Sequence, residues 1–334
     1  MSKMPRNLPR NRIKHLVAVG LVVIVGVAAA AASAKSFGPW STAQKIDEIA
    51  GNSTELNTPF IDGCPHQSPD GLSFYLASNR PRYAGDTRTD LDIWVAHREK
   101  KDEPFGDPVD LGEPINTTAD DFCPTPVGKH DLFFVSRKVV ADVTCGLGDI
   151  YVTHRNRGGD WSEPTHLSCA PSGPNSALDE MGPSYVKTHG HAQLYFSSSR
   201  TAAQGGGVPG DIFVSEQLAD DSFGPASAVA ALNDAAANDI QPNVRKDGRE
   251  VVFSSNRTGT LGGQDIWVAT RDRTDDPWSL PVNIGPAVNT AASETRPSFS
   301  GHAEQLSFGR SPSPEGGSDI YVSTRDKVED TDDD

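Results

Sequence analysis

Five acidic residues recur three positions before a proline along this chain. The pairs are Asp62/Pro65, Asp121/Pro124, Glu180/Pro183, Asp239/Pro242 and Glu294/Pro297. Carboxylates in equivalent positions could hold Ca²⁺ or another cation, or bind a cationic peptide, because like charges at close range need compensation. Two of them could instead act as acid and base, or acid and nucleophile, on a glycosidic bond. A third alternative is purely architectural, with each carboxylate accepting bonds from backbone amides nearby.

The segments that carry these acids repeat. Successive prolines are 59, 59, 59 and 55 residues apart, and each is followed by an apolar run and an Asp-Ile-aromatic triplet. The triplets begin at Asp92, Asp149, Asp211, Asp265 and Asp319. A period near 57 with several strands per unit is typical of a β-propeller.

One unit can be written out from Asp239. The unit predicts two strands at residues 239–245 and 250–255, joined by a hairpin turn. A third strand is predicted at residues 265–270. The fourth, at residues 277–284, lies at the sheet edge, where proline is tolerated. The aromatic residue of the fourth strand recurs as Phe105, Trp161, Phe223 and Trp278. After the fifth triplet this strand is missing, but a copy with Trp40 stands at residues 37–46. We therefore expect an all-β, five-bladed propeller of four-stranded antiparallel blades, with the last blade closed by the N-terminal strand.

The ends of the chain differ in composition from the repeats. Residues 1–34 join a basic segment to an apolar run and a small-residue cleavage site, which predicts a signal peptide or, alternatively, an uncleaved anchor. Residues 35–326 form the predicted propeller, and residues 327–334 a disordered acidic tail. We expect a secreted protein, periplasmic or extracellular, and a monomer.

The charge balance restricts the partners. The net charge is −15, and the first 34 residues carry five basic and no acidic side chains, so the remaining chain has a net charge of −20. Such a surface disfavours nucleic acid and anionic membranes, so we expect no membrane contact unless the N-terminal segment stays uncleaved.

Four cysteines fit the export prediction. They are Cys64, Cys123, Cys145 and Cys169. An even count in an exported chain favours two disulfides, and the pairing 64–123 with 145–169 is our prediction among three. No Cys-x-x-Cys spacing indicates a metal site, and no cofactor is expected.

Most of the repeated polar residues are predicted to be structural. The aspartates of the five triplets (Asp92, Asp149, Asp211, Asp265 and Asp319) follow glycine-rich turns, and we expect bonds to backbone or to the arginines after the second strands, Arg80, Arg200 and Arg257. An asparagine eight or nine residues before each proline is predicted to cap the turn between blades.

The acids before the prolines are the candidate functional residues. The first strand of a propeller blade is innermost, so we expect Asp62, Asp121, Glu180, Asp239 and Glu294 around one mouth of the central channel. Asp62, Glu180 and Glu294 are the candidates for catalysis if the protein is an enzyme.

The repeat resembles the WD40-like propeller repeat of TolB-type proteins. The resemblance rests on Ser-Pro-Asp-Gly at 68–71, Ser-Asn-Arg at 78–80 and 255–257, and the five triplets, and it covers about residues 36–326. Repeats two and five depart from it at 136–138 and 309–311. The resemblance implies the fold and a periplasmic or extracellular location, but not the partners of TolB.

The leading functional prediction is an exported, non-enzymatic scaffold that binds a protein, peptide or glycan at one face or at the channel mouth. It follows from the absence of any feature in the sequence that singles out one acid and one base. The alternative is a glycoside-acting hydrolase that uses the channel-mouth carboxylates.

Overall fold

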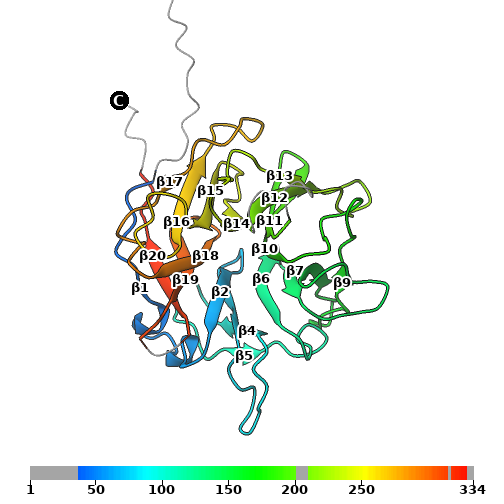
Figure 1. Cartoon of the computed structure of the whole chain (residues 1–334). Coiled ribbons are helices and arrows are strands. Elements are labelled where there is room, and N and C mark those ends of the chain that lie inside the picture. Colours follow the sequence, from blue (N-terminus) through cyan, green and yellow to red (C-terminus); the bar gives the residue numbers. More distant parts are fainter. Residues whose placement is uncertain (1–36, 201–209, 315–316, 329–334) are drawn as a thin grey trace, which may run out of the picture. The chain divides into compact units, whose positions relative to one another are not determined.

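Five four-stranded antiparallel sheets surround a central channel as the blades of a β-propeller (Figure 1). The computed structural model describes residues 37–200, 210–314 and 317–328; the predicted signal peptide and most of the acidic tail lie outside these ranges. Within each of blades 1–4 the strands are ordered from the channel outward in chain order. The repeat therefore predicted the architecture correctly.

The strands of each blade are as follows. Blade 1 contains β2 (Asp62–Gln67), β3 (Ser73–Ser78), β4 (Asp92–His97) and β5 (Val109–Asp110). Blade 2 contains β6 (Asp121–Val127), β7 (Asp131–Ser136), β8 (Asp149–His154) and β9 (Thr165–His166). Blade 3 contains β10 (Glu180–Thr188), β11 (His191–Ser198), β12 (Asp211–Glu216) and β13 (Ser227–Ala228). Blade 4 contains β14 (Asp239–Val244), β15 (Glu250–Ser255), β16 (Asp265–Thr270) and β17 (Val282–Asn283). Blade 5 contains β18 (Ser293–Phe299), β19 (Gln305–Ser311), β20 (Asp319–Thr324) and, at its outer edge, β1 (Gln44–Lys45).

Helices are short. Two 3₁₀ turns, η1 (Ile46–Glu48) and η2 (Thr54–Leu56), follow β1. Within residues 37–200, 210–314 and 317–328, no helix combines the length and the apolar composition that a membrane crossing needs.

The N-terminal strand closes the ring, as predicted. Gln44 and Lys45 of β1 pair with Val322 and Tyr321 of β20. The Trp40 ring stacks on Phe299 with 6.3 Å between ring centroids. Closure across the two ends of the chain gives blade 5 its fourth, outer strand.

The outer strands are shorter than the sequence predicted. Strand β17 covers two residues instead of the eight from 277 to 284, because Pro277 and Pro281 cannot donate to the ladder.

The repeated asparagines bind the backbone of the third strand where the short fourth strand does not pair with it, rather than capping a turn only. Asn116 Nδ2 donates to Ile93 O and its Oδ1 accepts from Ile93 N, both at 2.9 Å. Asn57, Asn175, Asn233 and Asn289 hold the isoleucines of the other triplets in the same way.

The hydrophobic core lies between neighbouring blades. Tyr75 and Ile93 of blade 1, for example, pack in one cluster with Leu132 and Phe134 of blade 2. Each inner strand alternates its side chains between the two neighbouring blades, so both sheet faces are buried.

Each innermost strand bulges at the residue before its proline. These residues are Cys64, Cys123, Gly182, Gln241 and Arg296, with φ between 47° and 59°, and the pairing with the second strand shifts register there in all five blades. A bulge re-aims side chains and strengthens the local twist. The five bulges define the narrow middle of the channel.

Neighbouring first strands are joined just beyond the bulges. Thr125 Oγ1 donates to Pro183 O at 2.5 Å, and Ser298 Oγ donates to Pro65 O at 2.6 Å. Ser184 and Asn243 accept backbone N–H bonds from the next blade. Between blades 1 and 2 the Cys64–Cys123 disulfide connects the strands. The second disulfide joins Cys145 to Cys169, so the predicted pairing is confirmed.

Candidate active site at the loop end of the channel

The five candidate acids begin the five innermost strands β2, β6, β10, β14 and β18. They lie at the end of the channel where the loops between second and third strands emerge, which we name the loop end; the other end, formed by the first hairpins, is the hairpin end. All five side chains are fully buried. The five acids therefore occupy equivalent positions at the start of the innermost strands, and their side chains face the protein rather than open solvent.

Each acid is held by a turn just before its strand. Thr58 donates to Asp62 Oδ2 through its backbone N at 2.6 Å and its hydroxyl at 2.7 Å. Three other acids accept the same pair of bonds, from the backbone N and the hydroxyl of one residue: Asp121 from Thr117, Glu180 from Ser176 and Glu294 from Thr290. Asp239 accepts a bond from the backbone N of Asp234. Several donors on one carboxylate favour its ionised form.

Arginines complete three of the five sites. Arg80 contacts Asp62 Oδ1 at 2.5 Å, Arg257 contacts Asp239 Oδ1, and Arg310 contacts Glu294 Oε1 at 2.7 Å. The sequence had assigned Arg80 and Arg257 to the triplet aspartates, which is wrong. The turn that follows the second strand returns to the start of the first strand, so the guanidinium reaches the innermost acid.

The triplet aspartates have other partners. Asp92 binds Arg82 Nε at 2.7 Å, Asp149 binds His166 Nε2 at 2.9 Å, and Asp265 accepts from Asn283 Nδ2 at 2.6 Å. Asp319 pairs with Lys45 Nζ of β1 at 2.7 Å. Asp211, the fifth, is also buried.

Two neighbouring acids break the symmetry of the ring. Repeat two has Lys138 at the position that Arg80 and Arg257 occupy in repeats one and four. Among the described residues, Asp121 Oδ1 is buried with no partner at full hydrogen-bond geometry. Burial raises the pKa of Asp121 to about 6, against the opposing effects of the Ser136 hydroxyl, the Thr117 donors and the Lys138 charge. In blade 3 the closest approach of Arg200 to Glu180 is 3.6 Å, and burial raises the pKa of Glu180 to about 7. These two carboxyl groups can carry a proton near neutral pH.

A cavity of about 210 Å³ lies at the loop end of blade 2, and we name it the blade-2 cavity. Asp121 does not line it, but Thr117 of the cavity wall donates to the Asp121 carboxyl group. Thr117 and Ser136, which flank Asp121, are part of its lining. The exposed carboxylate of Glu163 lines it as well, together with Tyr151 and Lys138. Burial raises the pKa of Tyr151 to about 12, so its hydroxyl keeps a proton, and that buried hydroxyl has no hydrogen-bond partner within the described chain.

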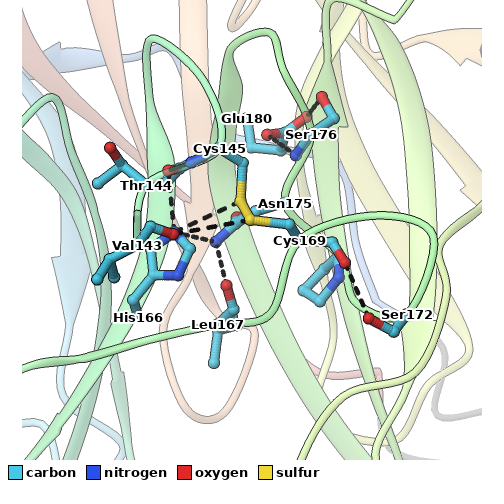
Figure 2. The surroundings of a disulfide bond; sticks show 12 residues. Val143, Thr144, Cys145, His166, Leu167, Cys169, Ser172, Asn175, Ser176 and Glu180 are labelled. Carbon is cyan, nitrogen blue, oxygen red and sulfur yellow. Dashed lines mark hydrogen bonds and ion pairs between the residues drawn. A yellow bond between two sulfur atoms is a disulfide. The ribbon is translucent and has the colours of Figure 1, made fainter. Parts of the chain in front are cut away.

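His166 forms one wall of this cavity and is fixed by its surroundings. Figure 2 shows its ring beside the Cys145–Cys169 disulfide, with Asn175 and Glu180 nearby. Its Nε2 lies 2.9 Å from Asp149 Oδ2 and 3.7 Å from Cys145 Sγ. The two sulfur atoms and this nitrogen are close enough to suit a metal ion, but sulfurs bonded to each other are not thiolate ligands. The disulfide therefore joins the loop that bears Cys145 to the segment that follows β9, the strand of His166.

The hairpin end of the channel is chemically different. Its cavity of about 360 Å³ is lined by Tyr185, Lys187, Lys246 and His66, and no Asp or Glu of the described residues lines it. Burial lowers the pKa of His66 to about 4, so this imidazole is neutral at pH 7. A reaction that needs two carboxyl groups therefore has its candidates at the loop end.

The raised pKa of Glu180 makes a prediction for stability. A carboxyl group whose pKa is higher in the folded state than in the unfolded state contributes stability below its unfolded pKa and loses it as pH rises through about 7. We expect Glu180→Gln to gain stability relative to the wild type by about 2–3 kcal/mol between pH 5 and pH 8. Urea unfolding at both pH values measures this, with the exposed Glu99→Gln as control. An unchanged pH slope in Glu180→Gln would show that Glu180 is ionised throughout.

Known proteins were compared with this chain in sequence and in structure. No protein-family model matches the chain, and no curated protein matches it. A thermostable family-43 glycoside hydrolase is similar in structure, with a TM-score of 0.51 and 14% identity over 82% of this chain and 91% of the hydrolase. An α-L-arabinofuranosidase from Lactobacillus brevis has a TM-score of 0.51 and 10% identity over 81% of this chain and 92% of its own. A putative TolB from Agrobacterium tumefaciens has a TM-score of 0.46 and 15% identity over 81% of this chain and 92% of its own. At these identities the likeness to the two hydrolases shows the propeller fold alone.

The comparisons correct the leading functional prediction. The similar structures are mainly glycoside hydrolases of family 43, and a xylosidase and an endo-arabinanase are also among them. These findings contradict the expectation of a non-enzymatic scaffold and favour the hydrolase alternative. The sequence contains no catalytic motif that marks one acid, whereas the structure separates Asp121 and Glu180 from the other three.

Proposed function

We propose that this protein is a glycoside-acting hydrolase that cleaves a glycosidic bond at the blade-2 cavity, with Asp121 as the proton donor. The observation that carries the proposal is a carboxyl group with a pKa of about 6 beside a sugar-sized cavity that a second carboxylate lines. Glycosidases work with such a pair, one member protonated and one ionised. The family-43 hydrolases among the similar structures support the same class of reaction.

The residues of the cavity divide the reaction between them. Asp121 gives its proton to the glycosidic oxygen as the bond to the anomeric carbon breaks. Glu163 acts on the other side of the sugar, either by taking a proton from the attacking water or by bonding to the anomeric carbon before water releases the product. The Tyr151 hydroxyl and the Lys138 ammonium donate to sugar hydroxyls.

Access to Asp121 requires a local movement. Its side chain is fully buried, and Thr117 donates to it from the cavity wall. A sugar oxygen that replaces the Thr117 hydroxyl would face the carboxyl group directly. Such tightening and exchange of hydrogen bonds on substrate binding is common in active sites.

We further propose that the substrate is an extracellular or cell-wall glycan. The two disulfides are typical of oxidising compartments outside the cytoplasm. A neutral or weakly charged sugar suits a protein whose net charge is −15.

A substrate panel tests the proposal. The full chain is incubated with aryl α-L-arabinofuranosides, β-xylosides and other aryl glycosides, and with polysaccharides whose new reducing ends are measured. Turnover of at least one glycoside is the expected result. Absence of turnover across the panel, in a preparation that unfolds cooperatively, would contradict the hydrolase assignment.

A further inference from the structure

The middle of the channel contains an arginine with no partner. Of the five bulge residues, Cys64 and Cys123 form a disulfide and Gly182 has no side chain, which leaves Gln241 and Arg296. The Arg296 guanidinium makes no hydrogen bond, ion pair or ring contact within residues 37–200, 210–314 and 317–328, and its Nε is fully buried. By contrast, Arg80, Arg257 and Arg310 each bind a carboxylate at the loop end.

The surroundings of Arg296 explain why it stays unpaired. Its Nη1 lies against the bare backbone of Gly63, where an added Cβ would be only 2.9 Å away. Three acids of the loop end, Asp62, Asp239 and Glu294, are bound to other arginines. No carboxylate contributes to the electrostatics of the Arg296 guanidinium, whose pKa burial lowers. An uncompensated buried charge is costly, so the fold favours a counter-ion at this point.

The space beside Arg296 is small and polar on one side. It measures about 30 Å³ and is bordered by Arg296, Gln241, the Cys64–Cys123 disulfide and the five prolines that follow the bulges. Gln241 Oε1 is buried and has no hydrogen-bond partner among the residues that the structure describes. A side-chain amide turned by 180° presents its NH₂ group in that position instead, which donates to an anion. A volume of this size holds one ion or one small head group and excludes a sugar.

We propose that the channel middle binds a single compact anion, chloride or a carboxylate head group, between the Arg296 guanidinium and the Gln241 amide. A guanidinium is suited to either, since it presents several N–H donors in one plane. The bound anion neutralises Arg296 and ties β18 to β14. This site is separate from the blade-2 cavity and does not depend on the proposed hydrolase activity.

Thermal unfolding of the full chain tests this proposal. The midpoint is measured at constant ionic strength while sodium gluconate is replaced by sodium chloride or by sodium formate. We expect a saturable rise of about 4 °C when the anion exceeds its dissociation constant a hundredfold. A response to chloride alone assigns a halide site, and a response to both assigns a site for compact anions in general.

Variants separate the site from general salt effects. Arg296→Met removes the charge but keeps a long apolar side chain, and it should abolish the anion response whether or not it changes the midpoint itself. Arg273→Met removes an exposed arginine and should keep the full response. The proposal is overturned if the wild type unfolds at the same temperature in all three salts, or if Arg296→Met still responds like the wild type.

Discussion

Asp121→Asn is expected to lower the turnover of a glycoside with a poor leaving group by 10²- to 10⁴-fold, the usual contribution of general acid catalysis. The asparagine keeps the size of the side chain and can still accept from Thr117 at 2.6 and 2.8 Å, but it has no proton to give. Activity of the wild type should fall as pH rises above about 6, because burial sets the pKa of Asp121 near that value. The measurement is kcat/KM as a function of pH for both proteins.

The leaving group distinguishes a catalytic from a structural role. A dinitrophenyl glycoside departs without protonation, so Asp121→Asn should retain far more of its activity on this substrate than on an alkyl glycoside. The matched control is Asp239→Asn, the equivalent acid of blade 4, whose carboxylate contacts Arg257. Equal losses on both substrates, or equal losses in both variants, would mean that Asp121 only stabilises the turn at Thr117.

The repeat was sufficient to predict the fold because each unit carries the signals for its own strands. Turn residues, alternating apolar runs and the triplet recur in register, and the copy around Trp40 stands where the last blade needs a strand. The disulfides could be predicted as well, since Cys64 and Cys123 occupy equivalent positions in adjacent blades and lie 4.7 Å apart between Cα atoms. Local pattern and global topology agree at these positions.

The partners of the acids could not be predicted from the repeat alone. Which carboxylate an arginine meets depends on how the turn after the second strand folds back, and Arg80 reaches Asp62 across 18 residues. The sequence does contain one signal for an unusual acid, in repeat two, where residues 136–138 depart from the family pattern. Lys138 replaces the arginine of repeats one, three and four, and Asp121 is the acid that loses its guanidinium as a result.

A second repeated residue escaped the sequence analysis. An arginine follows the triplet aspartate by six positions in four repeats, and its guanidinium lies over the aromatic residue of the fourth strand. The pairs are Arg98/Phe105, Arg155/Trp161, Arg271/Trp278 and Arg325/Trp40, with the arginine carbon 4.1–4.6 Å from the ring centroid. Gln217 takes this position in blade 3. The contact links the third strand to the fourth, where only two residues pair.

In blade 5 this arginine also closes the ring, and Arg325→Ala should therefore have a large effect on stability. Both terminal nitrogens of Arg325 donate to the Glu250 carboxylate of blade 4 at 2.8 Å, and its Nε donates to Ala303 O at 2.9 Å. Its guanidinium carbon lies 3.8 Å from the Phe37 ring centroid and 4.3 Å from that of Trp40. One side chain thus joins the N-terminal segment, the last strand and the neighbouring blade.

We expect Arg325→Ala to lower the free energy of unfolding by about 3–5 kcal/mol, the usual effect of breaking a buried ion pair. Arg325→Lys should recover only part of this loss, because an ammonium cannot make the two parallel bonds to Glu250 or lie flat on the rings. Arg273→Ala, which removes an exposed pair with Asp275, should change stability by less than about 1 kcal/mol. Urea unfolding of the three variants measures these differences, and a loss in Arg325→Ala as small as that in Arg273→Ala would show that the ring closes through β1 and β20 without this clamp.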